Sequence, residues 1–208
     1  MSRCATAPCA RGIGGAALMS LLLGMSVLPA SGQEAERGIY AGVAVGAADY
    51  EGGYAGVIYD DAPITWQVFG GYRLGERWSV ELGYQRFGDI DAENVRGSGI
   101  EWLEIGEQLD MVVVRGVLSV PLGELFSWRR RISLFGSVGY HLSGSQREVR
   151  KLPSLVSETD EREESGFALG GGARYELDAV ELRGYVERLN LGRTDVTWTA
   201  GVGMEFRF

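Results

Sequence analysis

A strict two-residue alternation is the feature that most limits how this chain can fold. From Val196 to Phe208 every second residue is apolar, and the residues between them are threonine, glycine, glutamate or arginine. Successive side chains of a β-strand point to opposite faces, so the pattern gives one apolar face and one polar face. In a helix the same apolar residues would scatter around the axis. The segment is therefore predicted to be a strand.

The same alternation recurs along the chain and predicts seven more strands. They cover residues 39–47, 66–73, 78–85, 112–118, 132–141, 167–176 and 180–187. Tight turns are expected near 75–77, 121–124 and 177–179, and longer polar loops near 49–63, 89–107 and 144–165, with a short loop near 190–195. Short turns that alternate with longer loops are typical of outer-membrane barrels. The fold class predicted is all-β, an eight-stranded antiparallel up-and-down transmembrane β-barrel.

The residues on the second face decide whether the apolar face points inward or outward. A lipocalin-like soluble barrel would hide its apolar face inside, whereas a membrane barrel turns it to lipid. The second face combines many glycines with ten charged residues, and long side chains beside small ones suit a narrow lumen. These ten are Arg73, Glu81, Arg115, Arg174, Glu176, Glu181, Arg183, Glu187, Glu205 and Arg207. The apolar face is therefore expected to meet lipid.

The N-terminal segment has the features of a secretory signal peptide. Arg3 and Arg11 give it a basic start, an apolar run covers 12–28, and Ala30 to Gly32 supplies small residues for cleavage after Ala30 or Gly32. The alternative is a helical membrane anchor. We expect a signal peptide at 1–32 and one barrel domain at 33–208. Each spanning strand needs roughly 9–11 residues, so 33–208 accommodates four hairpins with their loops.

Composition excludes several classes of function. Cys4 and Cys9 both lie in the predicted signal peptide, so the barrel domain has no cysteine for a disulfide or a metal site. Acidic residues number 28 against 20 basic ones, which argues against nucleic acid as a partner. No zinc-type ligand pattern or phosphate-binding loop is present in the sequence, and we expect no cofactor.

Three glycine-rich stretches together resemble the OmpA-like family of outer-membrane β-barrel domains. They cover residues 69–74 with 80–88, then 169–177, then 182–188. The resemblance extends over the whole barrel domain and rests on the order and spacing of the stretches. It implies that Met204, Phe206 and Phe208 form the C-terminal signal read by the barrel-assembly machinery. It also implies the outer membrane of a Gram-negative bacterium as the location.

The ten charged residues of the second face are the main candidate site. We expect them to form one salt-bridged network that fills the lumen, because an unpaired charge there would be costly. The alternative is a hydrated pore for small solutes. Measurement of conductance in a bilayer would separate the two.

His141 and Ser143 are the only residues that look catalytic. The motif His141-Leu142-Ser143 resembles the His-x-Ser pair of lipid A deacylases, which are also eight-stranded barrels. Alternation places both side chains in the lumen, however, whereas lipid A would have to be cleaved on the lipid side. We therefore predict no catalytic residues and a protein that is not an enzyme.

The leading functional hypothesis is a structural or surface-interaction role in the outer membrane. The alternatives are a small-solute pore and a lipid A-modifying esterase. Arg86 and Arg188 lie on the apolar face near the loop ends of their strands, where they could contact lipopolysaccharide phosphates or simply extend to the interface. The expected partners are outer-membrane lipid, lipopolysaccharide, the assembly machinery and an extracellular ligand bound by loops. We expect a monomer.

Overall fold

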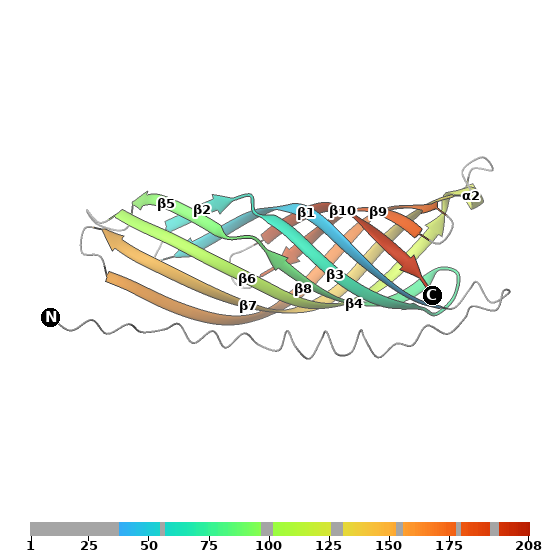
Figure 1. The fold of residues 1–208 in the computed structure, drawn as a ribbon, viewed down its shortest axis with the longest axis horizontal. Coiled ribbons are helices and arrows are strands. Elements are labelled where there is room, and N and C mark those ends of the chain that lie inside the picture. The colour runs from blue at the N-terminus through green and yellow to red at the C-terminus, as the bar shows by residue number, and fades with distance from the viewer. Residues whose placement is uncertain are drawn as a thin grey trace. The chain divides into compact units, whose positions relative to one another are not determined.

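The computed structural model describes residues 38–54, 57–96, 102–125, 131–152, 156–177, 180–191 and 196–208. The predicted signal peptide at 1–32 lies outside these residues. The elements are β1 (Gly38–Tyr54), β2 (Val57–Asp61), β3 (Ile64–Arg73), β4 (Trp78–Phe87), β5 (Ile90–Arg96), β6 (Trp102–Pro121), α2 (Leu122–Leu125), β7 (Ile132–Leu152), β8 (Val156–Leu177), β9 (Val180–Asn190) and β10 (Val196–Arg207). Figure 1 shows them from the side.

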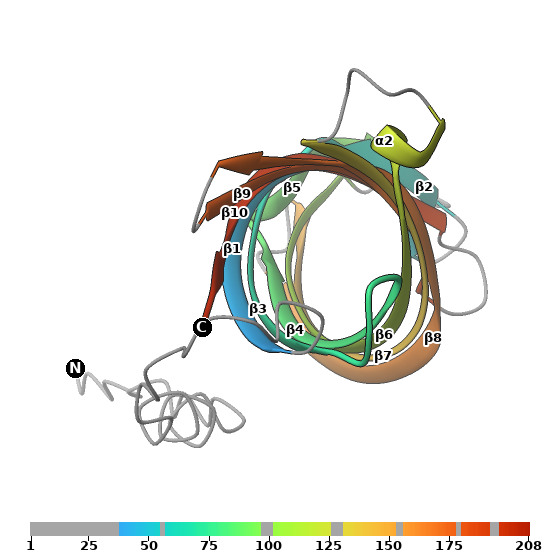
Figure 2. The same cartoon turned by 90° about the vertical axis from the view of Figure 1, so that its right-hand side faces the viewer.

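Eight of these strands form a closed antiparallel barrel. The order is β10-β9-β8-β7-β6-β4-β3-β1, and β1 closes the ring by pairing with β10 from Tyr40↔Arg207 to Asp49↔Trp198. Figure 2, which looks along the axis, shows the ring that they enclose. The predicted fold class is confirmed. Among the described residues, no helix is long and apolar enough to cross a membrane.

The apolar face points outward, as predicted. Val43, Val80, Val138 and Val202 are between 45 and 65 % exposed, as expected for side chains that meet solvent or lipid rather than a core. Their strand neighbours of the other parity face the inside of the barrel and are buried or half-buried, and Glu81 is 0 % exposed. The aromatic residues of the apolar face are also exposed at both ends of the barrel; they include Tyr72, Trp78 and Tyr175 at the short-turn end, and Tyr140 and Trp198 at the other.

Glycines on the inner face make room for large neighbours. A methyl group added at Gly71 would overlap the Tyr40 ring, and one added at Gly172 would overlap the Phe135 ring and the carbonyl of Gly184. The lumen of an eight-stranded barrel is just wide enough for side chains to fill it, so bulk on one strand needs space on the next.

Three of the four predicted loops are wrong, because the chain there continues as β-structure. We call residues 50–61, 90–107 and 144–166 the extension: β1 pairs with β2, β5 pairs with β6, and the β7–β8 ladder continues to Lys151↔Val156. The extension reaches furthest along β6, β7 and β8 (Figure 1). The sequence analysis missed the extension because its apolar side chains face inward and its polar ones outward, the opposite of the membrane-spanning part. Ile105, Leu109 and Met111 point inward, and Gln108 points outward.

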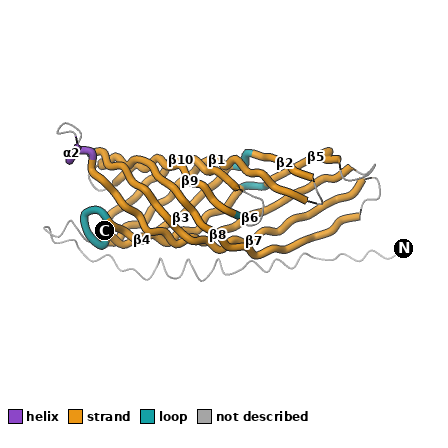
Figure 3. Tube along the Cα trace, turned by 180° about the vertical axis from the view of Figure 1, so that it is seen from behind, coloured by secondary structure: helices purple, strands orange, loops and turns teal. Residues whose placement is uncertain are grey.

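β2 and β5 continue β3 and β4 beyond short breaks. Pro63 interrupts the first line, since it has no N–H to donate, but its carbonyl still accepts from Ala48 N at 3.0 Å. Gly88 interrupts the second and donates its N–H to Ile64 O at 2.8 Å. Both breaks lie near the level where the barrel passes into the extension (Figure 3). The short helix α2 follows β6 directly, where the sequence predicted a tight turn near 121–124.

Candidate functional site in the lumen and the extension

Ion pairs line the lumen from its short-turn end inward. Arg73 Nη2 lies 2.8 Å from Glu181 Oε2 and 3.0 Å from Glu205 Oε1. Arg207 Nη1 lies 2.7 Å from Glu176 Oε1, and its other terminal nitrogen contacts Glu181. These residues come from β3, β8, β9 and β10, so the contacts join strands on different sides of the ring.

The same chain of contacts continues deeper through Glu81. Its carboxylate accepts from Arg174 Nη2 at 3.0 Å and from Arg183 Nη1 at 2.9 and 3.0 Å, while the Tyr40 hydroxyl donates to it at 2.9 Å. Arg174 also lies 3.4 Å from Glu205, which connects this cluster to the pairs at the mouth. Two arginines that converge on one fully buried carboxylate offset the cost of its desolvation.

Arg115 and Glu187 form a separate pair. Arg115 Nε and Nη2 donate to the two oxygens of Glu187 at 2.6 and 2.7 Å, the two-pronged geometry that makes such pairs strong. With its amide oxygen turned toward Arg115, Gln67 accepts from the same guanidinium at 2.7 and 3.2 Å. Among the described residues, the ten predicted side chains thus form an eight-membered chain and one separate pair.

Aromatic rings pack between the arginines. The Arg183 guanidinium carbon lies 5.0 Å from the centre of the Phe69 ring and 4.5 Å from that of Phe135, and Arg174 lies 4.7 Å from the Phe135 ring. A guanidinium over a ring face gains cation–π attraction while its apolar stem is buried. The rings and the ion pairs together fill this part of the lumen.

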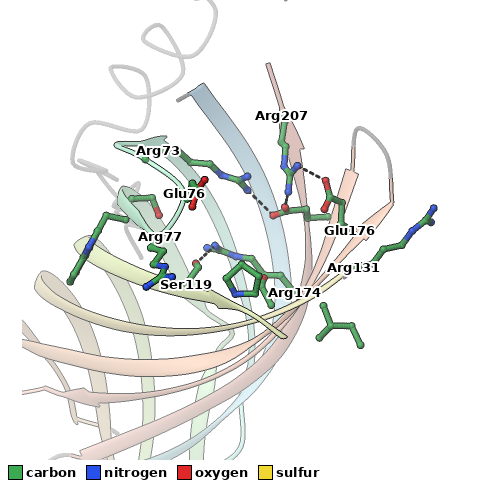
Figure 4. Close-up of a pocket in the computed structure, with 15 residues that line it drawn as sticks. Arg73, Glu76, Arg77, Ser119, Arg131, Arg174, Glu176 and Arg207 are labelled. Atoms are coloured by element: carbon green, nitrogen blue, oxygen red, sulfur yellow. Dashed lines mark hydrogen bonds and ion pairs between the residues drawn. The ribbon is translucent and has the colours of Figure 1, made fainter. Parts of the chain in front are cut away.

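The mouth of the lumen at the short-turn end is a cavity of about 160 Å³. Figure 4 shows Arg174 at its inner side, where its guanidinium donates to the Ser119 hydroxyl at 2.9 Å, with Arg73 and Arg207 paired to glutamates beside it. The cavity therefore ends at the network of ion pairs.

A further ion pair lies in the extension, further from the short turns than the ten predicted charged residues. Arg147 Nη2 donates to Glu107 Oε2 at 2.8 Å, and the Tyr50 hydroxyl donates to the same oxygen at 3.1 Å. All three side chains are buried. Sequence reasoning missed the pair because it ended the strands at 112 and 141. The inward parity of Arg115 and His141, continued along β6 and β7, would have found it.

Between the ion pairs of the lumen and the far end of the extension, an apolar cluster fills the barrel. We call it the upper core; it comprises Ala48, Tyr50, Phe87, Ile90, Ile105, Leu109, Met111, Val113, Val149, Ala168, Leu189 and Leu191. Each of these residues is at most 4 % exposed. The lumen is thus filled twice, by paired charges near the short-turn end and by apolar side chains at the other.

His141 and Ser143 both point into the barrel. His141 Nε2 lies 2.9 Å from the carbonyl oxygen of Asn190, and the Ser143 hydroxyl donates to the carbonyl of Glu164 at 3.3 Å. Among the hydrogen bonds of the described residues, none joins the two side chains. Neither residue is exposed on the outer face, since His141 is 0 % and Ser143 6 % exposed.

Charged residues on the outer surface meet aromatic ones where the barrel passes into the extension. Arg188 lies over the Trp198 ring, 5.8 Å from its centre. Arg86 Nε lies 3.7 Å from Asp110, and the Tyr84 hydroxyl donates to Asp110 at 2.8 Å. At the opposite end, Met204, Phe206 and Phe208 are 41–59 % exposed on the outer face.

The extension has a polar outer surface with local pairing. Glu148 accepts from Ser157 at 3.0 Å and from Arg150 at 3.1 Å, and these hydrogen bonds lower the pKa of its carboxyl. Arg162 pairs with Asp160 at 2.8 Å. Within the described ranges, no three acidic, histidine or cysteine residues gather as a metal site would require.

A family model for the outer membrane protein β-barrel domain matches residues 17–208. The chain belongs to this family. No curated protein sequence matches it. Among solved structures, this barrel resembles Neisserial surface protein A, at 12 % identity with a TM-score of 0.54, over 82 % of this chain and 97 % of that one.

Two further structures share the architecture of this outer-membrane barrel. Ail of Yersinia pestis, solved with the heparin analogue sucrose octasulfate, is 15 % identical with a TM-score of 0.52, over 82 % of this chain and 99 % of Ail. OprG of Pseudomonas aeruginosa is 15 % identical with a TM-score of 0.52, over 85 % and 98 % of the two chains. Identity this low shows a common fold alone.

Proposed function

We propose that this barrel is a non-enzymatic surface-interaction protein of a Gram-negative outer membrane, exported after cleavage of residues 1–32. Its short turns face the periplasm and its extension faces the outside, which is the arrangement usual for bacterial barrels. The barrel anchors the extension, and the extension contacts an external partner.

The filling of the lumen carries this proposal. A solute path along the axis would have to pass the Glu81 and Glu187 ion pairs and then the upper core. Breaking a buried pair leaves an uncompensated charge, and opening the upper core exposes apolar surface to water. Both energetic costs favour a closed anchor. The alternative function is still the small-solute pore.

The charge of the extension indicates the class of partner. Its three segments, residues 50–61, 90–107 and 144–166, together contain fourteen acidic and five basic residues. Ail was solved with a polyanion, whereas this acidic surface would repel one. The partner proposed here is therefore a cationic macromolecule.

Two other partners follow from the outer surface. Arg188 beside Trp198, and Arg86 beside Asp110, lie where the barrel passes into the extension, and their guanidinium groups suit lipopolysaccharide phosphates. The assembly machinery would read Met204, Phe206 and Phe208 on the terminal strand. No oligomer is needed for these roles.

Conductance in a planar bilayer tests the proposal. The purified barrel should give no stable channels, while an open porin inserted into the same bilayers serves as the positive control. Stable channels from the unmodified protein would contradict the closed anchor and favour the pore.

A further inference from the structure

Two of the eight barrel strands, β9 and β10, do not reach into the extension, so among the described residues β8 pairs there on its β7 side alone. β8 pairs with β7 from Tyr175 to Val156, which is nearly its whole length, but it pairs with β9 only between Ala168 and Leu177. On the other side of the opening, β1 pairs with β10 only as far as Asp49. In the described chain, therefore, no strand lies between β8 and β1 at the level of the extension.

The direction of the backbone groups on β8 follows from one hydrogen bond. Glu176 N donates to Arg131 O, so the even-numbered residues of β8 point their N–H and C=O groups toward β7. The β7–β8 register is continuous, so the odd-numbered residues point them the other way. Beyond the end of β9 at Asn190 these are Ser157, Thr159, Glu161, Glu163 and Ser165, which we call the β8 edge.

β9 ends at Asn190 and β10 begins at Val196, so at the level of the extension two of the eight strands are missing between β8 and β1. A strand added beside β8 would lie roughly 4.8 Å from it, in the place that β9 occupies nearer the short turns. A small cavity of about 20 Å³ lies nearby, and residues of β1, β6, β7 and β8 line it together with Leu191.

The charge of β8 selects the occupant. Residues 156–167 contain five acidic residues, Glu158, Asp160, Glu161, Glu163 and Glu164, and one basic residue, Arg162. A second copy of this chain would place like charges opposite each other across the new pair of strands, which is destabilising. A basic segment would place opposite charges there.

We infer that the β8 edge binds an extended cationic peptide segment of a partner protein by adding it to the sheet as a strand. Backbone hydrogen bonds would supply affinity, and the carboxylates would select basic side chains. The inference rests on the proposed function and names the partner class for it. Acidic side chains on β8 also protect the edge against self-association.

A peptide of alternating lysine and threonine, as long as the β8 edge, tests the inference. Binding to the full barrel in phosphatidylcholine nanodiscs is measured beside a peptide of the same charge whose backbone is N-methylated at alternate residues. We expect the methylated peptide to bind at least about tenfold more weakly, because it cannot donate to the edge. Equal binding of the two peptides would overturn strand addition.

A matched pair of variants locates the site. Glu161→Pro and Glu161→Ala remove the same charge, but only proline removes the N–H that points into the opening. Proline is tolerated here because, in the described chain, no neighbouring strand accepts a hydrogen bond from that N–H. Glu161→Pro should abolish binding, and Glu161→Ala should weaken it only slightly. Equal effects, or none, would overturn the inference. If the peptide experiments failed but the barrel still formed no channels in the bilayer assay, strand addition would be wrong and the proposed closed anchor would stand.

Discussion

Arg115 on β6 and Glu187 on β9 meet across the lumen through two hydrogen bonds of 2.6 and 2.7 Å, although they are 72 positions apart in sequence. Both side chains are almost fully buried, at 2 and 4 % exposure. A pair in this position holds opposite walls of the barrel together, and each partner depends on the other.

Removing one partner should cost far more than removing both. Glu187→Leu leaves the Arg115 charge buried and should lower the free energy of unfolding by about 3–5 kcal/mol. Adding Arg115→Met should recover most of that loss, because two apolar side chains need no counter-charge. Urea unfolding in lipid vesicles measures both. A single variant as stable as the wild type would show that the pair is not coupled.

The boundary between barrel and extension can be located with arginine substitutions. Val202→Arg places a charge on the lipid-facing surface and should cost about 2–4 kcal/mol. Thr159→Arg places the same side chain on the exposed surface of the extension and should change stability by less than about 0.5 kcal/mol. The two variants are compared by unfolding in the same vesicles. Similar costs would mean that the extension also lies in lipid.

Inner and outer glycines should respond in opposite ways to alanine. A methyl group at Gly172 would overlap the Gly184 carbonyl and the Phe135 ring, so Gly172→Ala should destabilise by about 1–3 kcal/mol. A methyl group at Gly136 meets no atom within 4 Å, so Gly136→Ala should be neutral or stabilise by about 0.4–1 kcal/mol. Thermal unfolding of both variants provides the comparison, and equal losses would contradict the crowding of the lumen.

Ser143→Ala should leave lipid A unchanged. The Ser143 hydroxyl donates to a backbone carbonyl inside the barrel, so it is not presented to lipid. Mass spectrometry of lipid A from cells that express the wild-type or the variant protein checks this, with Ser145→Ala as a control. If the wild-type protein deacylated lipid A and the variant did not, the protein would be an esterase and the proposed non-enzymatic role would be contradicted.

The sequence predicted the barrel well because the alternation of β4 or β10 reflects one physical boundary, lipid outside and a crowded lumen inside. It failed in the extension for two reasons. Along β6 the apolar parity changes sides between Val112 and Leu109, so a pattern that expects apolar residues outside finds none. Along β8, residues 157–165 carry no alternation, and their strand is held by the ladder to β7.

Sequence alone could not assign the partners within the lumen. Parity places Arg183 and Glu81 inside, but their contact depends on the register of strands that lie across the ring from each other. Glu107 and Arg147 were missed because the two strands were predicted to end at 112 and 141. Residues beyond those positions were therefore not assigned to the inner face.

The reversal of polarity along the strands determines how deeply the molecule sits in the membrane. Sliding inward would bring Gln108 and the carboxylates of β8 into hydrocarbon, and sliding outward would expose Leu142 and Phe167 to water. Both displacements raise the free energy, so the vertical position is held from two directions. The height at which the β8 edge stands above the lipid is thus set within the chain itself.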